Sequence, residues 1–132
     1  MSWTNLEDKV IVVTGGAAGI GLAVVKGFVE VGAKVMIADF SEEAGIRAVE
    51  EASSSGPGEA DFYKCDVSSK QNVDALIDKT VEKWGGVDAL VNNAGINVPR
   101  LLVDPAGTEE LTEEIWDKVF SVHVKGQFLC AQ

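Results

Sequence analysis

The sequence is poor in cysteine and histidine. Its 132 residues include two cysteines, Cys65 and Cys130, and one histidine, His123. The cysteines lie far apart in the sequence, without CxxC spacing or a nearby histidine cluster, which argues against a zinc site and a disulfide scaffold. We therefore expect two buried thiols, no bound metal and a reducing, cytoplasmic environment.

Positive charge and long apolar runs are also scarce. Eleven basic residues face twenty-one acidic ones, and the formal net charge is −10. A charge of this size repels phosphate backbones and anionic lipid, so neither nucleic acid nor a membrane surface is an expected partner. No apolar run approaches the roughly 20 residues that span a bilayer. The first ten residues, MSWTNLEDKV, lack the features of a signal peptide.

Short apolar segments alternate with helix-like patterns along the chain. We expect strands at 10–13, 34–39, 61–67 and 89–95, and helices at 19–31, 41–53, 69–84 and from about 112. Ser41 and Thr112 each precede two glutamates, and Ser68 with Gln71 fits a capping box. The alternation predicts one α/β domain over residues 1–132. We expect it to be a Rossmann-like, doubly wound parallel sheet of order 3-2-1-4 between two layers of helices.

The turn between the first strand and the first helix is almost free of side chains. The stretch VVTGGAAGIGLAVV (12–25) contains four glycines and three alanines. Glycines let a ligand approach the backbone, and the helix that follows offers unpaired N–H groups with a partial positive charge. No Gly-Lys-Ser/Thr follows, which excludes a P-loop. An ordinary tight turn is the alternative to a diphosphate site.

Asp39 closes the second expected strand, 18 residues beyond Gly21. An acid at this place can accept hydrogen bonds from the ribose hydroxyls of a dinucleotide. Its charge would repel a 2′-phosphate, and Ala17, Ala18 and Phe40 offer no cation to neutralise one. The sequence therefore predicts NAD(H) rather than NADP(H). A strand-end or helix-capping aspartate is the alternative.

Three motifs, TGGAAGIG (14–21), CDV (65–67) and NNAG (92–95), occur in an order and spacing that resemble the short-chain dehydrogenase/reductase family. The resemblance covers nearly the whole chain. It implies an NAD-dependent oxidoreductase that interconverts a secondary alcohol and a ketone by hydride transfer.

The same resemblance implies which residues contact the cofactor. Gly15, Gly19, Ile20 and Gly21 would line the diphosphate site, and Asp39 would hold the adenosine ribose. Asp66 and Val67 would flank the adenine, while Asn93 and Gly95 would approach the nicotinamide-side ribose. Two alternatives stay open: Asp66 caps the next helix together with Ser68, and Asn93 clamps neighbouring strands.

The connection INVPRLLVDP (96–105) resembles the sorbitol-6-phosphate 2-dehydrogenase branch of this family. This implies a small-molecule alcohol or ketone as substrate, such as a polyol phosphate. Arg100 is the one cation in the stretch and would meet the sugar phosphate; pairing with Asp104 is the alternative. Relatives usually form dimers or tetramers, so we expect a homodimer or homotetramer of the full-length protein.

The sequence departs from the family in its catalytic residues. The family uses a serine and a Tyr-x-x-x-Lys pair, whereas the only tyrosine here, Tyr63, is followed four positions later by Val67. We expect the chain to be the amino-terminal half of a longer enzyme, truncated after about four strands and inactive alone. The alternative is a non-catalytic module or sensor that binds a dinucleotide.

His123, in FSVHVKG (120–126), stands where the family typically has an asparagine. The family asparagine helps to kink its helix and holds a water of the proton relay. An imidazole donates and accepts hydrogen bonds and titrates near neutrality, so His123 is a candidate catalytic residue. A polar helix residue without a chemical role is the alternative.

Overall fold

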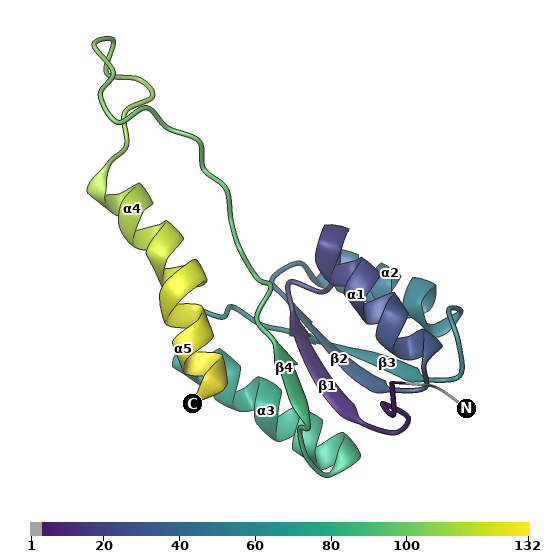
Figure 1. Cartoon of the computed structure of the whole chain (residues 1–132). Helices are drawn as coiled ribbons and strands as arrows, with labels where there is room; N and C mark the ends of the chain where they lie inside the picture. Colours follow the sequence, from purple (N-terminus) through teal and green to yellow (C-terminus); the bar gives the residue numbers. More distant parts are fainter. Residues whose placement is uncertain (1–3) are drawn as a thin grey trace.

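The computed structural model describes residues 4–132 and contains a four-stranded parallel sheet (Figure 1). The strands are β1 (Val10–Thr14), β2 (Lys34–Asp39), β3 (Glu59–Lys64) and β4 (Ala89–Val91). Their order is β3-β2-β1-β4, which confirms the predicted strand order. β4 lies at one end of the sheet and pairs with β1.

Helices cover both faces of this sheet. They are α1 (Gly19–Glu30), α2 (Glu42–Ser53), α3 (Lys70–Trp84), α4 (Glu113–Phe120) and α5 (Gly126–Ala131), with a π-helical segment, η1 (Ser121–Lys125), between α4 and α5. Figure 1 shows α1 and α2 on one face, and α3 with the α4–α5 helix on the other. The predicted three-layer α/β architecture is confirmed.

The two faces of the central strands carry separate apolar cores. Ile11, Val13, Val35 and Ile37 belong to a core beneath α1 and α2. Val12, Met36 and Ala38 belong to a second core beneath α3 and α5. Because successive side chains of a strand point to opposite faces, the continuous apolar runs of β1 and β2 fill both cores.

Side-chain caps begin three of the helices. Ser41 accepts from Ala44 N (3.3 Å) at α2, and Thr112 accepts from Ile115 N (3.2 Å) at α4, as their positions predicted. The predicted cap of α3 is wrong: Ser69, not Ser68, accepts from the backbone N–H of Asn72. Ser68 is instead held by the carboxylate of Asp66.

Two strands are shorter than predicted at their carboxyl ends. β3 ends at Lys64, and not at residue 67, because its partner β2 ends at Asp39, the residue paired with Lys64. β4 ends at Val91, and not at residue 95. Beyond Val91, the chain bonds to the side-chain hydroxyl of Thr14, so the backbone ladder ends there.

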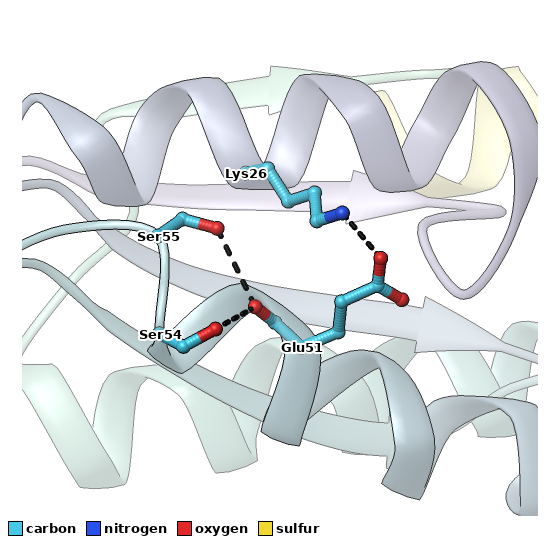
Figure 2. Close-up of polar contacts among 4 residues, drawn as sticks. All are labelled: Lys26, Glu51, Ser54 and Ser55. Carbon is cyan, nitrogen blue, oxygen red and sulfur yellow. Dashed lines mark hydrogen bonds and ion pairs between the residues drawn. The ribbon is translucent and has the colours of Figure 1, made fainter.

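An ion pair joins α1 and α2 on the outer face of their layer (Figure 2). Lys26 Nζ contacts the carboxylate of Glu51, and both side chains are partly exposed. The carbonyl oxygen of Glu51 accepts from Ser54 Oγ (2.8 Å) and Ser55 Oγ (3.4 Å), which closes the end of α2. Exposed pairs of this kind contribute about 0–1 kcal/mol, so packing against the sheet holds the two helices.

The segment between β4 and α4 projects away from the sheet (Figure 1). Its outer part is organised by Asp104, whose carboxylate accepts backbone hydrogen bonds from Ala106 (3.0 Å), Thr108 (3.0 Å) and Glu109 (2.8 Å). These bonds lower the pKa of Asp104. Across residues 4–132, no helix combines the length and apolar character that a membrane span requires.

Candidate functional site

A cavity of about 700 Å³ lies at the carboxyl ends of the strands. This is where a doubly wound sheet places its ligands. All nine residues predicted to bind a cofactor line the cavity: Gly15, Gly19, Ile20, Gly21, Asp39, Asp66, Val67, Asn93 and Gly95. The fold thus brings together residues from four separate parts of the sequence.

Two glycines at the start of α1 differ in what surrounds them. A Cβ on Gly21 would lie 2.2 Å from the carbonyl oxygen of Gly15, so close packing excludes any side chain there. Gly19 has a φ of +56°, and a Cβ on it would meet nothing within 4 Å. Gly21 is therefore required for close packing against the backbone of Gly15, whereas Gly19 leaves open space at the cavity wall.

The amino terminus of α1 has no side-chain cap. Ala18 occupies the capping position without a side-chain hydrogen bond, and the first turn contains no acidic residue. The N-terminal N–H groups of a helix need partners and carry a partial positive charge. Since Ala18, Gly19 and Ile20 line the cavity and are exposed, this end of the helix offers donors to an anion.

Asp39 sits beside this helix terminus with both carboxylate oxygens engaged. Oδ2 accepts from the backbone N–H of Ala17 (3.2 Å), and Oδ1 accepts from that of Ser41 (3.2 Å). These bonds fix the carboxylate at the cavity wall and leave further lone pairs for a ligand. The strand-end role and a binding role are therefore compatible.

Asp66 follows β3 and also bonds locally. Its Oδ1 accepts from Ser68 N (2.9 Å) and Ser68 Oγ (2.6 Å), while its own N–H donates to Asn72 Oδ1 (3.1 Å). The alternative, that Asp66 caps α3 together with Ser68, is wrong: the two residues bond to each other, and Ser69 caps α3. Asp66, Val67 and Ser68 together form one side of the cavity.

Asn93 joins the end of β4 to the glycine-rich turn. Its Nδ2 donates to the carbonyl oxygen of Gly15 (3.1 Å). The buried hydroxyl of Thr14 accepts from Asn93 N and Ala94 N, each at 3.0 Å, and donates to Val91 O (3.3 Å). Asn93 therefore clamps neighbouring strands and also lines the cavity. Thr14 was not among the predicted site residues, although it begins the TGGAAGIG motif.

Other cavity residues were not predicted. Phe40 and Cys65 are next to the predicted residues Asp39 and Asp66 in the sequence, at the ends of β2 and β3. Their place beside these residues could have identified them as cavity residues. Lys118, Ser121 and Val122 come from α4 and η1, and no motif placed this segment at the cavity.

Burial, with lesser effects of Cys130 and Asp66, raises the pKa of Cys65 to about 12, so the thiol stays protonated at neutral pH.

His123 lies beside the cavity and does not line it. Its Nε2 is 3.0 Å from Ile96 N and 2.8 Å from Ile96 O. A Cβ on Gly95 would lie 2.6 Å from the imidazole Cε1, so the ring packs directly against the Gly95 backbone. Gly95 and Ile96 both line the cavity, and His123 thereby supports its wall.

The structure does not bring Arg100 to the cavity. Arg100 is exposed and donates to the carbonyl oxygen of Pro99 (2.7 Å). The alternative pairing with Asp104 is wrong, because none of the ion pairs among residues 4–132 joins these two side chains. The Asp104 carboxylate instead accepts from the backbone of its own loop. In the described part of the chain, no group of three or more His, Cys, Asp or Glu side chains is placed to hold a metal ion.

One protein-family model matches most of the sequence. The model described as "short chain dehydrogenase" matches residues 9–132. The chain belongs to the short-chain dehydrogenase family. Its relatives in this family are oxidoreductases, and the motifs that carried the resemblance lie around the cavity.

Curated relatives of the short-chain dehydrogenase family match nearly all of the chain. It is 42% identical to sorbitol-6-phosphate 2-dehydrogenase of Klebsiella pneumoniae, covering 99% of this chain and 47% of that protein. It is 40% identical to short-chain dehydrogenase reductase 3a of Arabidopsis thaliana, covering 96% of this chain and 46% of that protein. The chain thus spans about half the length of these relatives.

Solved structures of the family share the fold. A short chain dehydrogenase from Mycobacterium smegmatis superposes with a TM-score of 0.85 at 36% identity, covering 95% of this chain and 50% of the other. A 3-ketoacyl-(acyl-carrier-protein) reductase from Brucella melitensis, complexed with NADH, superposes with a TM-score of 0.83 at 33% identity. The match covers 96% of this chain and 48% of the reductase chain.

Proposed function

We propose that this chain is the cofactor-binding half of an NAD-dependent oxidoreductase that interconverts a secondary alcohol and a ketone. The observation that carries the proposal is the uncapped amino terminus of α1, which opens onto the 700 Å³ cavity beside Asp39. Backbone donors and a carboxylate at this spacing match a diphosphate joined to a ribose.

The described residues fit a dinucleotide along the length of the cavity. Gly19, Ile20 and Gly21 would hold the diphosphate through the backbone N–H groups that open α1, and the open space above Gly19 would admit it. Gly15 would line the same site, while its own N–H donates to the carbonyl oxygen of Ala38 (2.7 Å). Asp39 accepts from the adenosine ribose hydroxyls. Asp66 and Val67 flank the adenine, and Asn93 and Gly95 approach the nicotinamide-side ribose. NAD, when bound, supplies the hydride acceptor; the residues of this chain bind and orient it.

Asp39 supports a preference for NAD(H). A carboxylate fixed by the N–H groups of Ala17 and Ser41 disfavours a 2′-phosphate at the same ribose by like-charge repulsion. The Brucella melitensis relative is described in complex with NADH, which is consistent with this preference.

A pair of glutamate substitutions tests the binding site. Gly19→Glu places a carboxylate where the diphosphate would lie, and Gly85→Glu is the matched control. Both glycines have a positive φ and open space around them, but Gly85 ends α3, away from the cavity. We expect Gly19→Glu to weaken NADH binding about tenfold or more in a fluorescence titration, and Gly85→Glu to leave it unchanged. If the Gly19→Glu and Gly85→Glu variants bind NADH with equal affinity, the proposal is overturned.

The substrate class rests on the sequence relationship to the Klebsiella pneumoniae enzyme. We propose a polyol phosphate such as sorbitol 6-phosphate for the full-length protein. Arg100, which lies outside the cavity in this structure, stays a candidate contact to its phosphate from the projecting segment. We expect the purified chain to bind NADH without oxidising sorbitol 6-phosphate. Tyr63, the only tyrosine, lies on β3 and is followed at the lysine position by Val67. Formation of NADH by the chain alone would contradict this.

His123 is a further candidate for the catalytic machinery of the full-length protein. Its Nε2 contacts the backbone N and O of Ile96, which supports a role in holding the cavity wall. The relay role is a further proposal that rests on the family resemblance. If His123 takes part in the relay, His123→Asn should alter the pH profile of the full-length enzyme. An unchanged rate and profile would dismiss the relay role.

An apolar stripe on the α4–α5 helix supports the expected homodimer or homotetramer. The side chains of Trp116, Phe120, Val124 and Phe128 recur every four residues and are each more than 40% exposed. Trp116 and Phe120 stack with ring centroids 4.5 Å apart. Light scattering coupled to size-exclusion chromatography of the full-length protein tests this assembly. A monomer at all protein concentrations would contradict the proposed homodimer or homotetramer. The cytoplasmic location stays a prediction.

A further inference from the structure

We propose that Lys64 is a second determinant of cofactor selectivity and partly offsets the repulsion that Asp39 exerts on a 2′-phosphate. The inference rests on the proposed dinucleotide site. Ala17, Ala18 and Phe40, the neighbours of Asp39 that the sequence indicates, carry no positive charge. The structure adds a lysine from another strand to this neighbourhood.

The sheet register brings Lys64 to Asp39. The two are paired residues of the parallel strands β2 and β3, at the last position of each strand. Paired residues of neighbouring strands lie about 4.8 Å apart and direct their side chains to the same face. Ile37 and Phe62, two positions before Asp39 and Lys64, both belong to the α1–α2 side of the sheet. The carboxylate and the ammonium therefore extend from the same side.

The ammonium of Lys64 lies near a residue that lines the cavity. Its Nζ lies 5.7 Å from the centroid of the Phe40 ring. Phe40 directly follows Asp39, lines the cavity and is 69% exposed. Lys64 thus holds a positive charge over the residue that borders the ribose end of the site.

This charge is available to a ligand. Lys64 is exposed, and the ion pairs found within residues 4–132 use other lysines: Lys26, Lys34, Lys70 and Lys83. A 2′-phosphate carries a charge of about −1.5 to −2 at neutral pH, as other phosphate monoesters do, and would be attracted to the ammonium. NAD(H) lacks this phosphate and carries its negative charge on the diphosphate, so Lys64 should act chiefly on the phosphorylated dinucleotide.

The test compares NADH and NADPH binding by fluorescence titration at low ionic strength. Lys64→Met removes the charge and keeps an apolar side chain over Phe40. Lys34→Met, at the opposite end of β2, is the matched control, and Lys64→Arg is the rescue variant. We expect Lys64→Met to raise the Kd for NADPH about threefold to fivefold and to leave that for NADH unchanged. Lys34→Met should change neither value, and Lys64→Arg should behave as wild type.

The outcomes separate this inference from the proposed function. If the chain binds NADH and Lys64→Met does not alter NADPH binding, the inference is overturned and the dinucleotide site stands. An equal loss for both dinucleotides shows a packing role for Lys64 and also overturns it. If the chain binds neither dinucleotide, both proposals fail.

Discussion

The side-chain amide of Asn93 donates to the carbonyl oxygen of Gly15 across 3.1 Å, and a Cβ on Gly21 would lie 2.6 Å from the same amide nitrogen. The end of β4, the glycine-rich turn and the first turn of α1 therefore meet at one point. Because this point forms part of the cavity wall, packing at Gly21 governs both the fold and the site.

Gly21→Ala should destabilise the chain by about 1–3 kcal/mol, because the new methyl group overlaps backbone atoms that have little room to move. Gly27→Ala is the matched control in the same helix, where a Cβ meets nothing within 4 Å. It should stabilise by about 0.5–1 kcal/mol through helix propensity. Urea unfolding measures both. Changes of the same sign would contradict the packing described here.

Thr14→Val should destabilise the chain by about 2 kcal/mol, since the N–H groups of Asn93 and Ala94 lose the hydroxyl oxygen that accepts from both. Thr14→Ser keeps the hydroxyl and should retain more of the stability, losing only what the methyl group contributes. The comparison again uses urea unfolding. If the valine variant is as stable as wild type, the hydroxyl does not hold this junction.

Much of the fold followed from the sequence because the apolar pattern of β1 and β2 is continuous and the motifs mark the chain turns. Strand ends were harder to predict. Lys64 ends β3 because Asp39 ends its partner, and Thr14 ends the β4 ladder through a side chain. Both boundaries depend on contacts between segments that lie far apart in the sequence.

The site was predicted where a motif marked it. The contributions of Lys118 and Ser121 were missed because an irregular connection places α4 at the cavity, and no local pattern specifies that path. Lys64 was missed for a related reason: its proximity to Asp39 comes from sheet register. His123 was identified as a candidate, but its contact with Ile96 became visible only in the folded chain.

Alkaline pH should destabilise the chain through Cys65. Burial raises the pKa of this thiol in the folded state from 9.0 to about 12. Between these values the unfolded chain loses a proton that the folded chain keeps, so the free energy of unfolding falls as pH rises. Unfolding measured from pH 8 to 10.5 should show a steeper decline for wild type than for Cys65→Ala. Parallel curves would contradict this assignment.

Asp104→Ala should loosen the projecting segment without altering the sheet. The carboxylate accepts from the backbone of Ala106, Thr108 and Glu109, and its pKa is lowered by these bonds. Hydrogen exchange at these amides should accelerate in the variant, while that of β1 and β2 stays slow. In wild type the same loosening should appear as the pH falls through the lowered pKa, because protonation weakens the acceptor. Unchanged exchange would show that the carboxylate does not order the loop.

The uncapped amino terminus of α1 should receive the diphosphate of a dinucleotide. A crystal structure of the chain with NADH tests it most directly. We expect diphosphate oxygens within hydrogen-bonding distance of the backbone nitrogens of Gly19 to Gly21, with the adenosine ribose on Asp39. NADH bound elsewhere, with the start of α1 facing solvent, would contradict it.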